Sequence, residues 1–400
     1  MNNYMTCEDI ICDANNLYSA YKASVRNSKW KESSQRFMLQ YLNNIINLQD
    51  DLKNRTYNSG STGEFVLTER GKIRPITSYQ PRDRIVRHVL CDDVLMPRIL
   101  NHIIYDNCAS VKGRGLSQQN KRFEVHLRKY YQKYGNNGYI LFGDFSKFFD
   151  NVIHDIAKEQ LLALWNHDEY LDWLLTVIFK SFQVDVSYMS DLEFFNRFSS
   201  IFNSIEYRTI PKKLLTGEKM MEKSVNIGDQ LSQMIGIYYP HPIDNYVKYV
   251  ESQQFYGRYM DDWYIMSPDK TELKRLLLEI EKIANSLGLH INHRKTRIVK
   301  ISKTFKFLQI KYTLTASGKI IKRANPKRVT TMRRKLKKLH NKLQNGLIEY
   351  NNIEEMFRGW MGSYKKLLSK QQRTNMIKLY EQLFNKHISI FKGKMIITEG

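Results

Sequence analysis

The chain has 400 residues, of which 42% are hydrophobic, so it is long enough to form more than one packed lobe. Lysine and arginine (63) outnumber aspartate and glutamate (40), and the net charge of +23 predicts a polyanionic partner. Nucleic acid is the first candidate for that partner. A solvated basic surface without a partner is the alternative. No long apolar segment or signal peptide is evident, so we expect no membrane contact and a cytoplasmic location.

The cysteines of the chain do not indicate a disulfide framework or a zinc site. There are four in 400 residues, and none forms a C-x-x-C pair. They are Cys7, Cys12, Cys91 and Cys108. We therefore expect reduced thiols that pack inside the protein.

The first third of the chain predicts helices around one hairpin. Residues 1 to about 60 have apolar residues at helical spacing and end in turn residues, which predicts an N-terminal helical extension. The segment FVLTERGKIRPITSYQ, residues 65–80, predicts two short strands around a turn at residues 69–71. A helical period returns over residues 81–100. Residues 108–135 predict a glycine-containing loop that leads into a basic helix.

The middle of the chain alternates strands and helices. Residues 139–142 predict an apolar strand that ends at Asp144, and a helix-rich stretch follows. Residues 184–224 are polar and without a period, which predicts an irregular insertion. The next segments predict a helix opened by a glycine turn, a hairpin, an amphipathic helix and further strands: residues 225–252, 255–266, 270–289 and 297–315. From about residue 320 the chain is helical and very basic.

Two adjacent aspartates, Asp261 and Asp262, lie between the strands of the hairpin FYGRYMDDWYIM. A tight turn is one interpretation, because aspartate tolerates turn geometry. A metal site is the other, because neighbouring carboxylates repel one another unless a cation lies between them. With Asp144, they would suit two Mg²⁺ ions about 4 Å apart, since oxygen ligands favour Mg²⁺ over Zn²⁺. Unrelated surface aspartates are the remaining alternative.

The order of the sequence motifs resembles that of reverse transcriptases. The motifs are DFSKFFD (144–150), IGDQLSQ (227–233), YMDD (259–262), NHRKT (292–296) and FKFLQ (305–309). Upstream, KIRPI, PRDRIVRHVL and CASVKGRG are similar to fingers motifs of the bacterial branch, which includes group II intron, retron and diversity-generating enzymes. The resemblance covers roughly residues 60–315 and implies RNA-templated DNA synthesis.

The resemblance also implies the fold. We expect an α+β right-hand polymerase with fingers and palm, an antiparallel palm sheet with helices, and an all-α thumb. The implied divisions are an N-terminal helical extension (1–60), fingers (61–138), a palm that contains the irregular segment 184–224 (139–315), and a basic helical thumb (316–400).

The catalytic roles follow from the resemblance position by position. Asp144 and Asp261 match the main metal ligands, Asp262 matches an adjacent and less direct acid, and the backbone of Phe145 joins them. The implied cofactor is a pair of Mg²⁺ ions, with Mn²⁺ as a substitute. Phe149 matches an aromatic residue that packs on the sugar and excludes a ribose 2′-OH, which implies dNTP substrates.

A second group of residues matches nucleotide contacts. Besides Phe149 these are Lys72, Arg74, Gly228, Gln230 and Lys295. Cationic side chains neutralise phosphate oxygens as charge moves to the leaving group, although Lys72 and Arg74 could also lie on a solvated strand face. Lys295 matches a proposed general acid for the pyrophosphate, and a phosphate contact is the alternative role.

The residues expected to contact template or primer are Arg84, Ser232, Gln233, Phe307, Leu308, Lys327, Arg333, Arg334 and Lys337. Arg84 has a second interpretation, an ion pair with Asp83. The last four belong to residues 321–343, which contain no acidic residue. An apolar stripe runs through that segment at Val329, Met332, Leu336, Leu339 and Leu343. It predicts a helix that packs on its domain and contacts duplex phosphates.

Two segments depart from the common bacterial pattern. The form I-G-x-x-x-S-Q at residues 227–233 replaces Q-G-x-x-x-S-P and resembles diversity-generating and some defence-associated enzymes. Gln309 replaces the usual glycine after Phe-Leu. The implied partners are a cognate structured noncoding RNA, the DNA product, dNTPs, and an accessory protein or a second copy. An inactive RNA-binding scaffold and an RNA-dependent RNA polymerase are the alternative functions; antiphage defence and diversity generation both stay open as roles.

Overall fold

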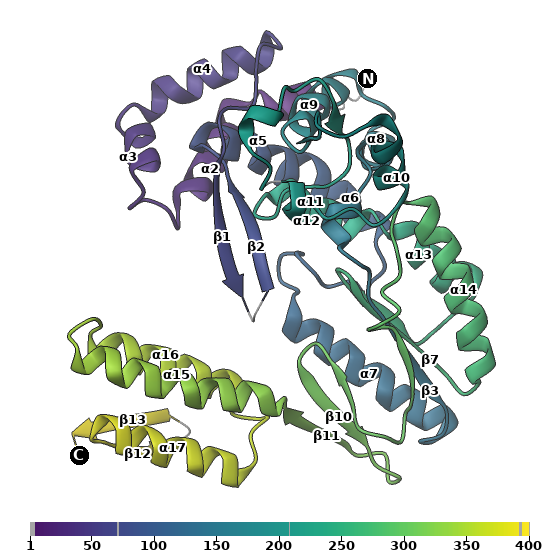
Figure 1. Ribbon diagram of the computed structural model, residues 1–400. Coiled ribbons are helices and arrows are strands. Elements are labelled where there is room, and N and C mark those ends of the chain that lie inside the picture. The colour runs from purple at the N-terminus through teal and green to yellow at the C-terminus, as the bar shows by residue number, and fades with distance from the viewer. Residues whose placement is uncertain (1–4, 70–71, 208, 392–393, 400) are drawn as a thin grey trace. The chain divides into compact units, whose positions relative to one another are not determined.

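The structure is a computed structural model that describes residues 5–69, 72–207, 209–391 and 394–399 (Figure 1). Contacts divide the chain into two compact units: Met1–Gln119 with Leu141–Ile298, and Asn120–Ile140 with Val299–Gly400. All four cysteines are buried free thiols, as predicted. Among the described helices, none has the length and apolar character needed to cross a membrane.

Four helices form the N-terminal extension, as the helical spacing predicted. They are α1 (Cys7–Ile11), α2 (Ala14–Val25), α3 (Glu32–Leu39) and α4 (Tyr41–Lys53). Asp13 begins α2 by accepting a hydrogen bond from the Asn16 N–H at 2.9 Å, which satisfies a donor that the first helical turn leaves open. Leu17 and Val25 are buried on α2, and this helix packs against α5 (Pro81–Val89).

A hairpin and a broken helix follow the extension. Strands β1 (Gly63–Glu69) and β2 (Lys72–Ser78) pair antiparallel, as predicted, although the turn residues 70–71 lie outside the described residues. Residues 81–100 are helical, as predicted, with a π-helical stretch (Leu90–Leu95) between α5 and α6 (Met96–His102). The hairpin therefore leads directly into buried helical structure.

A four-stranded sheet in the order β6-β7-β3-β8 carries the acidic motifs. Its strands are β3 (Tyr139–Gly143), β6 (Tyr256–Tyr259), β7 (Asp262–Ser267) and β8 (Arg297–Lys300). The amphipathic helix α14 (Lys270–Ser286) packs on β7 and buries Leu273, Leu276 and Ile280. Further helices of the first unit are α8 (His154–Ala163), α9 (Glu169–Lys180), α12 (Gln230–Tyr238) and α13 (His241–Asn245).

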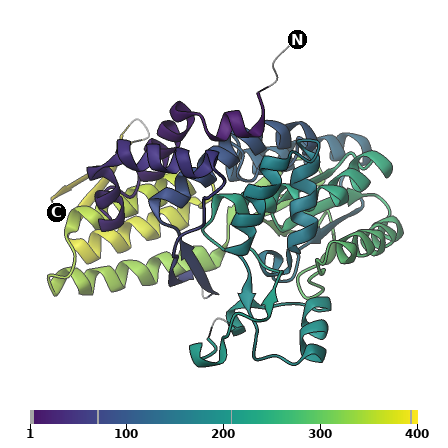
Figure 2. The same ribbon diagram turned by 90° about the horizontal axis from the view of Figure 1, so that it is seen from above.

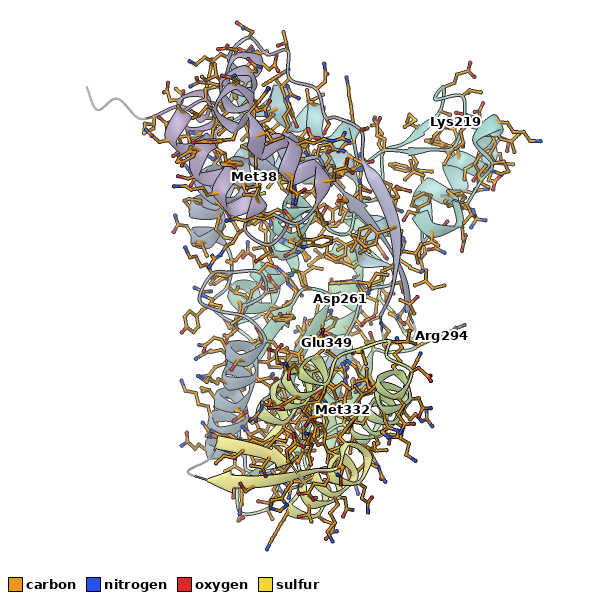
Figure 3. The ribbon with its side chains drawn as sticks, turned by 90° about the vertical axis from the view of Figure 1, so that its left-hand side faces the viewer. Met38, Lys219, Asp261, Arg294, Met332 and Glu349 are labelled. Atoms are coloured by element: carbon orange, nitrogen blue, oxygen red, sulfur yellow. The ribbon has the colours of Figure 1, made fainter. Side chains whose placement is uncertain are left out.

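Residues 184–224 form a small subdomain, so the prediction of an irregular insertion was wrong. Its elements are β4 (Val184–Asp185), α10 (Asp191–Ser199), α11 (Ser204–Tyr207) and β5 (Met220–Met221). Val186, Phe202 and Met221 are buried in a core of its own. The subdomain projects from the rest of the first unit (Figure 2), and Lys219 marks it in Figure 3. Two-residue strands are too short to produce a recognisable period.

In the second unit the basic helix α7 (Leu116–Tyr134) packs on a three-stranded sheet. The sheet has the order β11-β10-β9, with β9 (Phe305–Phe307), β10 (Ile310–Leu314) and β11 (Ile320–Ala324). The Phe123 ring on α7 lies 4.7 Å from the Phe307 ring and 5.0 Å from the Tyr312 ring. Aromatic side chains thus fix this helix on its sheet.

The C-terminal part of the second unit is a helical layer that ends in a hairpin. Helices α15 (Pro326–Gln344), α16 (Tyr350–Tyr364) and α17 (Lys370–Phe384) share one core. The predicted stripe on α15 is confirmed: Met332, labelled in Figure 3, and Leu336 are buried, and its other members pack against the same core.

The prediction that residues 316–400 are all helical was wrong. Asn385 adopts a left-handed conformation (φ 49°) that ends α17, and the hairpin β12 (Lys386–Phe391) and β13 (Lys394–Glu399) follows. Ile388 is buried, and Ile397, its partner in the ladder, packs on the same core. The alternating apolar residues of the segment fit a half-buried strand, which explains the outcome.

Candidate active site

Two strand ends bring acidic residues side by side. Asp144 directly follows β3, and Asp262 begins β7, the neighbour of β3 in the sheet. Gly143 faces the Trp263 ring so closely that a Cβ atom at Gly143 would lie 2.0 Å from Trp263 Cζ2. Only glycine permits this approach. Because Gly143 precedes Asp144 and Trp263 follows Asp262, the two acidic positions lie at adjacent strand ends.

The turn between β6 and β7 presents Asp261. Tyr259 pairs with Asp262 across the hairpin, so Met260 and Asp261 form the two-residue turn (Figure 3 labels Asp261). Met260 has a φ of 55°, and such a left-handed conformation costs a non-glycine residue roughly 1–2 kcal/mol. The turn and the metal site are therefore compatible interpretations of the same residues.

A buried arginine donates a hydrogen bond to this turn and stabilises it. Arg258 is 0% exposed, and its Nη1 donates to the Met260 carbonyl at 3.2 Å. Its Nη2 donates to Asp244 Oδ2 at 2.6 Å and to the Ile237 carbonyl at 2.8 Å. Nη1 also donates to the Gly236 carbonyl at 3.3 Å. One buried guanidinium thus joins the hairpin to α12 and α13, a role that the sequence did not reveal.

Asp144 is held by a lysine. Lys295 Nζ donates to both carboxylate oxygens of Asp144, at 2.6 and 2.7 Å, and Asn292 Nδ2 donates to Asp144 Oδ1 at 3.1 Å. The backbone fixes this arrangement, because the Asn292 N–H donates to the Asp144 carbonyl at 2.8 Å. From the sequence we expected Lys295 to act as a general acid or to contact phosphate. Neither role includes this ion pair with Asp144.

The donors fit a hard divalent cation. Asp144 and Asp261 offer carboxylate oxygens, and the Phe145 carbonyl lies next to Asp144 in the chain. Within the described residues, however, no group of three His, Cys, Asp or Glu side chains is close enough to hold a metal ion. The three-aspartate site remains a prediction, and Lys295 must leave the Asp144 carboxylate before a cation takes its place.

Phe149 lies beside the hairpin turn. A Cβ atom at Gly236 of α12 would lie 3.2 Å from Phe149 Cε1 and 3.1 Å from Met260 Sδ. The Phe149 ring is half-buried, whereas Phe148 is 5% exposed and belongs to the core. A half-buried aromatic ring and the turn residue that precedes Asp261 therefore both lie against Gly236.

Gly228 lies against β2. The Thr77 N–H donates to the Ile227 carbonyl at 3.0 Å, and a Cβ atom at Gly228 would lie 3.0 Å from the Thr77 carbonyl. With a φ of +107°, this position requires glycine. The contact joins the segment to the strand of Arg74, a half-buried residue. Lys72 begins that strand, but its side chain lies outside the described residues.

A buried ion pair that the sequence did not reveal fixes the same segment. Arg87 Nε donates to Asp229 Oδ2 at 2.7 Å, and the two side chains are 2% and 0% exposed. Asp229 also caps α12 by accepting from the Leu231 N–H at 2.9 Å. An aspartate after a glycine and before an apolar helix is a cap signal, so this part of its role could have been found from the sequence.

The two glutamines of α12 have partners within the protein. Gln230 Nε2 donates to Asp92 Oδ1 at 2.7 Å, and Gln233 Oε1 accepts from the Ser110 hydroxyl at 3.0 Å. Ser232 is 2% exposed and its hydroxyl has no hydrogen-bond partner among the described residues, so its contact with template or primer stays a prediction. Gln233 is exposed, and its contact with template or primer stays a prediction.

Arg84 contacts the N-terminal extension and does not pair with Asp83 in the structure. Its Nη1 donates to Ser28 Oγ at 3.0 Å and its Nη2 to Ser34 Oγ at 3.1 Å. Desolvation by burial lowers the pKa of Arg84. Asp83 is not its ion-pair partner, because Asp83 Oδ1 accepts from the Tyr57 hydroxyl at 2.7 Å. The predicted ion pair with Asp83 was therefore wrong, and the contact of Arg84 with the template stays a prediction.

Both phenylalanine side chains of the FKFLQ segment are buried. Phe307 is 4% exposed and packs on α7, and its contact with the primer stays a prediction. Leu308 and Gln309 form the turn between β9 and β10, with φ values of 42° and 73°. The predicted basic residues of α15 are exposed, which suits phosphate contacts: Lys327, Arg333, Arg334 and Lys337.

The family follows from a match to a protein-family model. Residues 66–312 match the model described as reverse transcriptase (RNA-dependent DNA polymerase), which is more than half of the chain. The chain belongs to the reverse transcriptase family. The matched residues include all three aspartates, Phe149 and Gly228, so the geometry described above belongs to a reverse transcriptase domain. Reverse transcriptases generally use divalent metal ions.

A curated relative agrees with this family. A protein of Saccharomyces cerevisiae named for intron 1 of COX1/OXI3 is 21% identical to the chain over 291 residues. The alignment covers 63% of this chain and 33% of the yeast protein. The chain thus spans about a third of the length of that relative.

Proposed function

We propose that this chain copies RNA into DNA by nucleotidyl transfer with two divalent cations. The observation that carries the proposal is the placement of Asp144 and the Asp261–Asp262 turn at adjacent strand ends, with Phe149 and the turn residue Met260 both against Gly236. Asp144, Asp261 and the Phe145 carbonyl would hold the cations, Mg²⁺ with Mn²⁺ as a substitute. When bound, the cations activate the attacking hydroxyl and stabilise the pyrophosphate leaving group.

The other residues of the site would bind and orient the nucleotide. Phe149 would lie under the sugar, where a 2′-hydroxyl would collide with its ring. Arg74 would contact phosphate from β2, next to Gly228, whose lack of a side chain allows close approach. Lys295 would exchange the Asp144 carboxylate for a phosphate oxygen when a cation binds to Asp144.

Primer extension tests the proposal. The purified chain should incorporate dNTPs on an RNA template with an annealed primer when Mg²⁺ is present. The Asp261→Asn variant keeps the shape of the turn and should lose the activity by at least about a hundredfold. No incorporation by the wild-type chain in Mg²⁺ or Mn²⁺ would sink the proposal.

Sugar selection is a separate test of Phe149. We expect Phe149→Ala to raise the incorporation of rNTPs relative to dNTPs, because the ring that blocks the 2′-hydroxyl is removed. Phe148→Ala is a poor control because that ring is buried, so the control is Phe195→Ala, which removes an aromatic ring that is 68% exposed on α10. Unchanged sugar selectivity in Phe149→Ala would remove this role and would favour an RNA-dependent RNA polymerase.

An inactive RNA-binding scaffold is a second candidate, and one observation favours it. Lys295 holds both oxygens of Asp144, which are the oxygens that a cation needs. The two candidates differ in one measurement. A scaffold would bind RNA equally well with and without Mg²⁺ and would extend no primer, whereas an enzyme would extend primers in proportion to bound cation.

We further propose that the template is a cognate structured noncoding RNA, copied by a chain of the bacterial branch. The I-G-x-x-x-S-Q form of residues 227–233 supports this assignment. Sequencing the DNA made in the native host distinguishes the roles. Faithful DNA copies of one noncoding RNA would favour defence, whereas substitutions at template adenines would favour diversity generation. Copies of unrelated messenger RNAs would contradict a cognate template.

A further inference from the structure

A cavity lies in the second unit between α16, the start of α17 and the C-terminal hairpin. Its volume is about 360 Å³, and its apolar walls are Met361, Ile390 and Met395, with Gly362 also in the lining. Ligand pockets in proteins span about 300–1,000 Å³. This cavity is therefore at the small end of the range, large enough for one flat group but too small for a duplex. The elements that form it lie together in Figure 1.

The polar part of the lining is entirely cationic. Arg358, Lys365 and Arg373 line the cavity, and no carboxylate is among its lining residues in the part of the chain that the structure describes. Arg358 is bonded to Glu354 at 2.7 Å and donates to the Met395 carbonyl, so it fixes the wall to the hairpin. The remaining cations favour an anionic ligand.

Arg373 supplies the strongest sign of a missing acceptor. Its Nη2 donates to the Lys365 carbonyl at 2.6 Å. Its Nε is buried and has no hydrogen-bond acceptor among the described residues. A buried N–H without an acceptor is unfavourable, and a charged acceptor oxygen would satisfy it.

The glycines of α16 keep space open beside these cations. A Cβ atom at Gly362 or at Gly359 would meet no atom within 4 Å. Gly362 lines the cavity, and Gly359 does not. Glycine in a helix interior is unfavourable relative to alanine, so the open space at Gly362 has a cost in helix stability.

We propose that this cavity binds one unpaired nucleotide of an RNA strand. The base would lie on Met361, Ile390 and Met395, because polarizable and aliphatic side chains suit the face of a base. Its phosphate would pair with the guanidinium of Arg373, which lines the cavity. The exposed basic face of α15 in the same unit would contact the backbone beyond that nucleotide. The assignment to RNA rests on the proposed function, in which RNA is the template.

The test compares three labelled hairpins in a fluorescence anisotropy titration at one salt concentration. One RNA hairpin has a single-nucleotide bulge in its stem, tested with each of the four bases; the second is fully paired; the third is a DNA hairpin with the same bulge. We expect the wild-type chain to bind the bulged RNA about tenfold more tightly than the paired RNA, the size of one buried base contact.

Two glycine variants provide a matched pair. Gly362→Leu should fill the cavity without a clash and abolish the preference for the bulge, whereas Gly359→Leu on the same helix should retain it. Circular dichroism checks that both are folded. Arg373→Gln should weaken binding of the bulged RNA and lower the salt slope by about one counterion, which a purely structural role would not do.

Each outcome decides the proposal. Equal binding of bulged and paired RNA by the wild-type chain, or an equal preference in the two glycine variants, would overturn it. An equal preference for the bulged DNA would overturn the assignment to RNA. Primer extension on an unstructured template is measured in parallel: a chain that binds the bulge through this cavity but extends no primer contradicts only the proposed polymerase function.

Discussion

Arg258→Met is the substitution that should most damage the site without touching an acidic residue of it. In the wild-type chain the guanidinium and the Asp244 carboxylate are 0% and 1% exposed and meet at 2.6 Å. Methionine has a similar length and no charge. The variant would leave a buried carboxylate whose remaining partner is the Tyr256 hydroxyl at 2.5 Å. It would also leave the Met260, Ile237 and Gly236 carbonyls without this donor.

The expected loss is large relative to the stability of a domain. Removing one partner of a buried ion pair typically costs about 3–5 kcal/mol, because the other charge stays buried without compensation. Folded domains are stable by only about 5–15 kcal/mol. The double variant Arg258→Met/Asp244→Leu removes both charges and should therefore be more stable than Arg258→Met alone, by about 1–3 kcal/mol.

Urea unfolding followed by circular dichroism measures these differences, and primer extension below the unfolding midpoint measures the effect on the turn. Arg258→Lys keeps the charge but cannot reach all three carbonyls, so it should lose more activity than stability. The exposed pair of Arg36 with Glu32, at 78% and 76% exposure, supplies the control, and Arg36→Met should leave the unfolding midpoint unchanged.

Two results would refute the reasoning. One is a loss of less than about 1 kcal/mol in Arg258→Met, since solvent or another cation would then have to satisfy Asp244. The other is additivity, in which the double variant loses the sum of the two single losses. Either result would mean that Arg258 does not hold the hairpin by its contact with Asp244.

Three further predictions concern other parts of the chain. Lys295→Met should lower the Mg²⁺ concentration for half-maximal primer extension about threefold, because the ammonium competes for Asp144; an increase would contradict this competition. Gln309→Gly should raise the free energy of unfolding by about 1 kcal/mol, because φ is 73° there and glycine adopts this conformation without strain. Urea unfolding measures the change, and a lower free energy of unfolding in the variant would contradict the prediction. Burial lowers the pKa of His154 to about 4. As the pH falls, the unfolded state binds a proton at this histidine before the folded state does, so stability should fall by up to about 3 kcal/mol between pH 6.5 and 4. The melting temperature of His154→Gln should depend less on pH than that of the wild-type chain. An unchanged pH dependence would exclude His154 as the cause.

Local patterns in the sequence predicted many of the elements. The apolar stripe of α15 anticipated which of its residues are buried, because helical spacing alone decides which side chains share a face. The hairpin around Asp261 was predicted in the same way from alternating residues and a turn. The order of the motifs also pointed to the family that the match over residues 66–312 shows.

Contacts between distant segments were not predictable in this way. Arg84 looked like a template contact or a partner of Asp83, yet Ser28 and Ser34, 56 and 50 positions earlier, accept its hydrogen bonds. Phe307 looked like a primer contact, yet it packs on Phe123 of α7. In each case the residue type suited both solvent and interior, and only the neighbouring element decided between them.

The sequence by itself determined the chemistry of this protein: its positive charge, its aspartates at strand ends and turns, and the order of its reverse transcriptase motifs. The tertiary structure decided which charges meet. Lys295 forms an ion pair with Asp144, which lies 151 positions earlier in the sequence. Arg258 donates to a carbonyl of α12 because the packing of the hairpin against that helix buries the two groups together. The physical reason is that periodicity is a short-range property, whereas the partner of a buried charge depends on how distant elements pack.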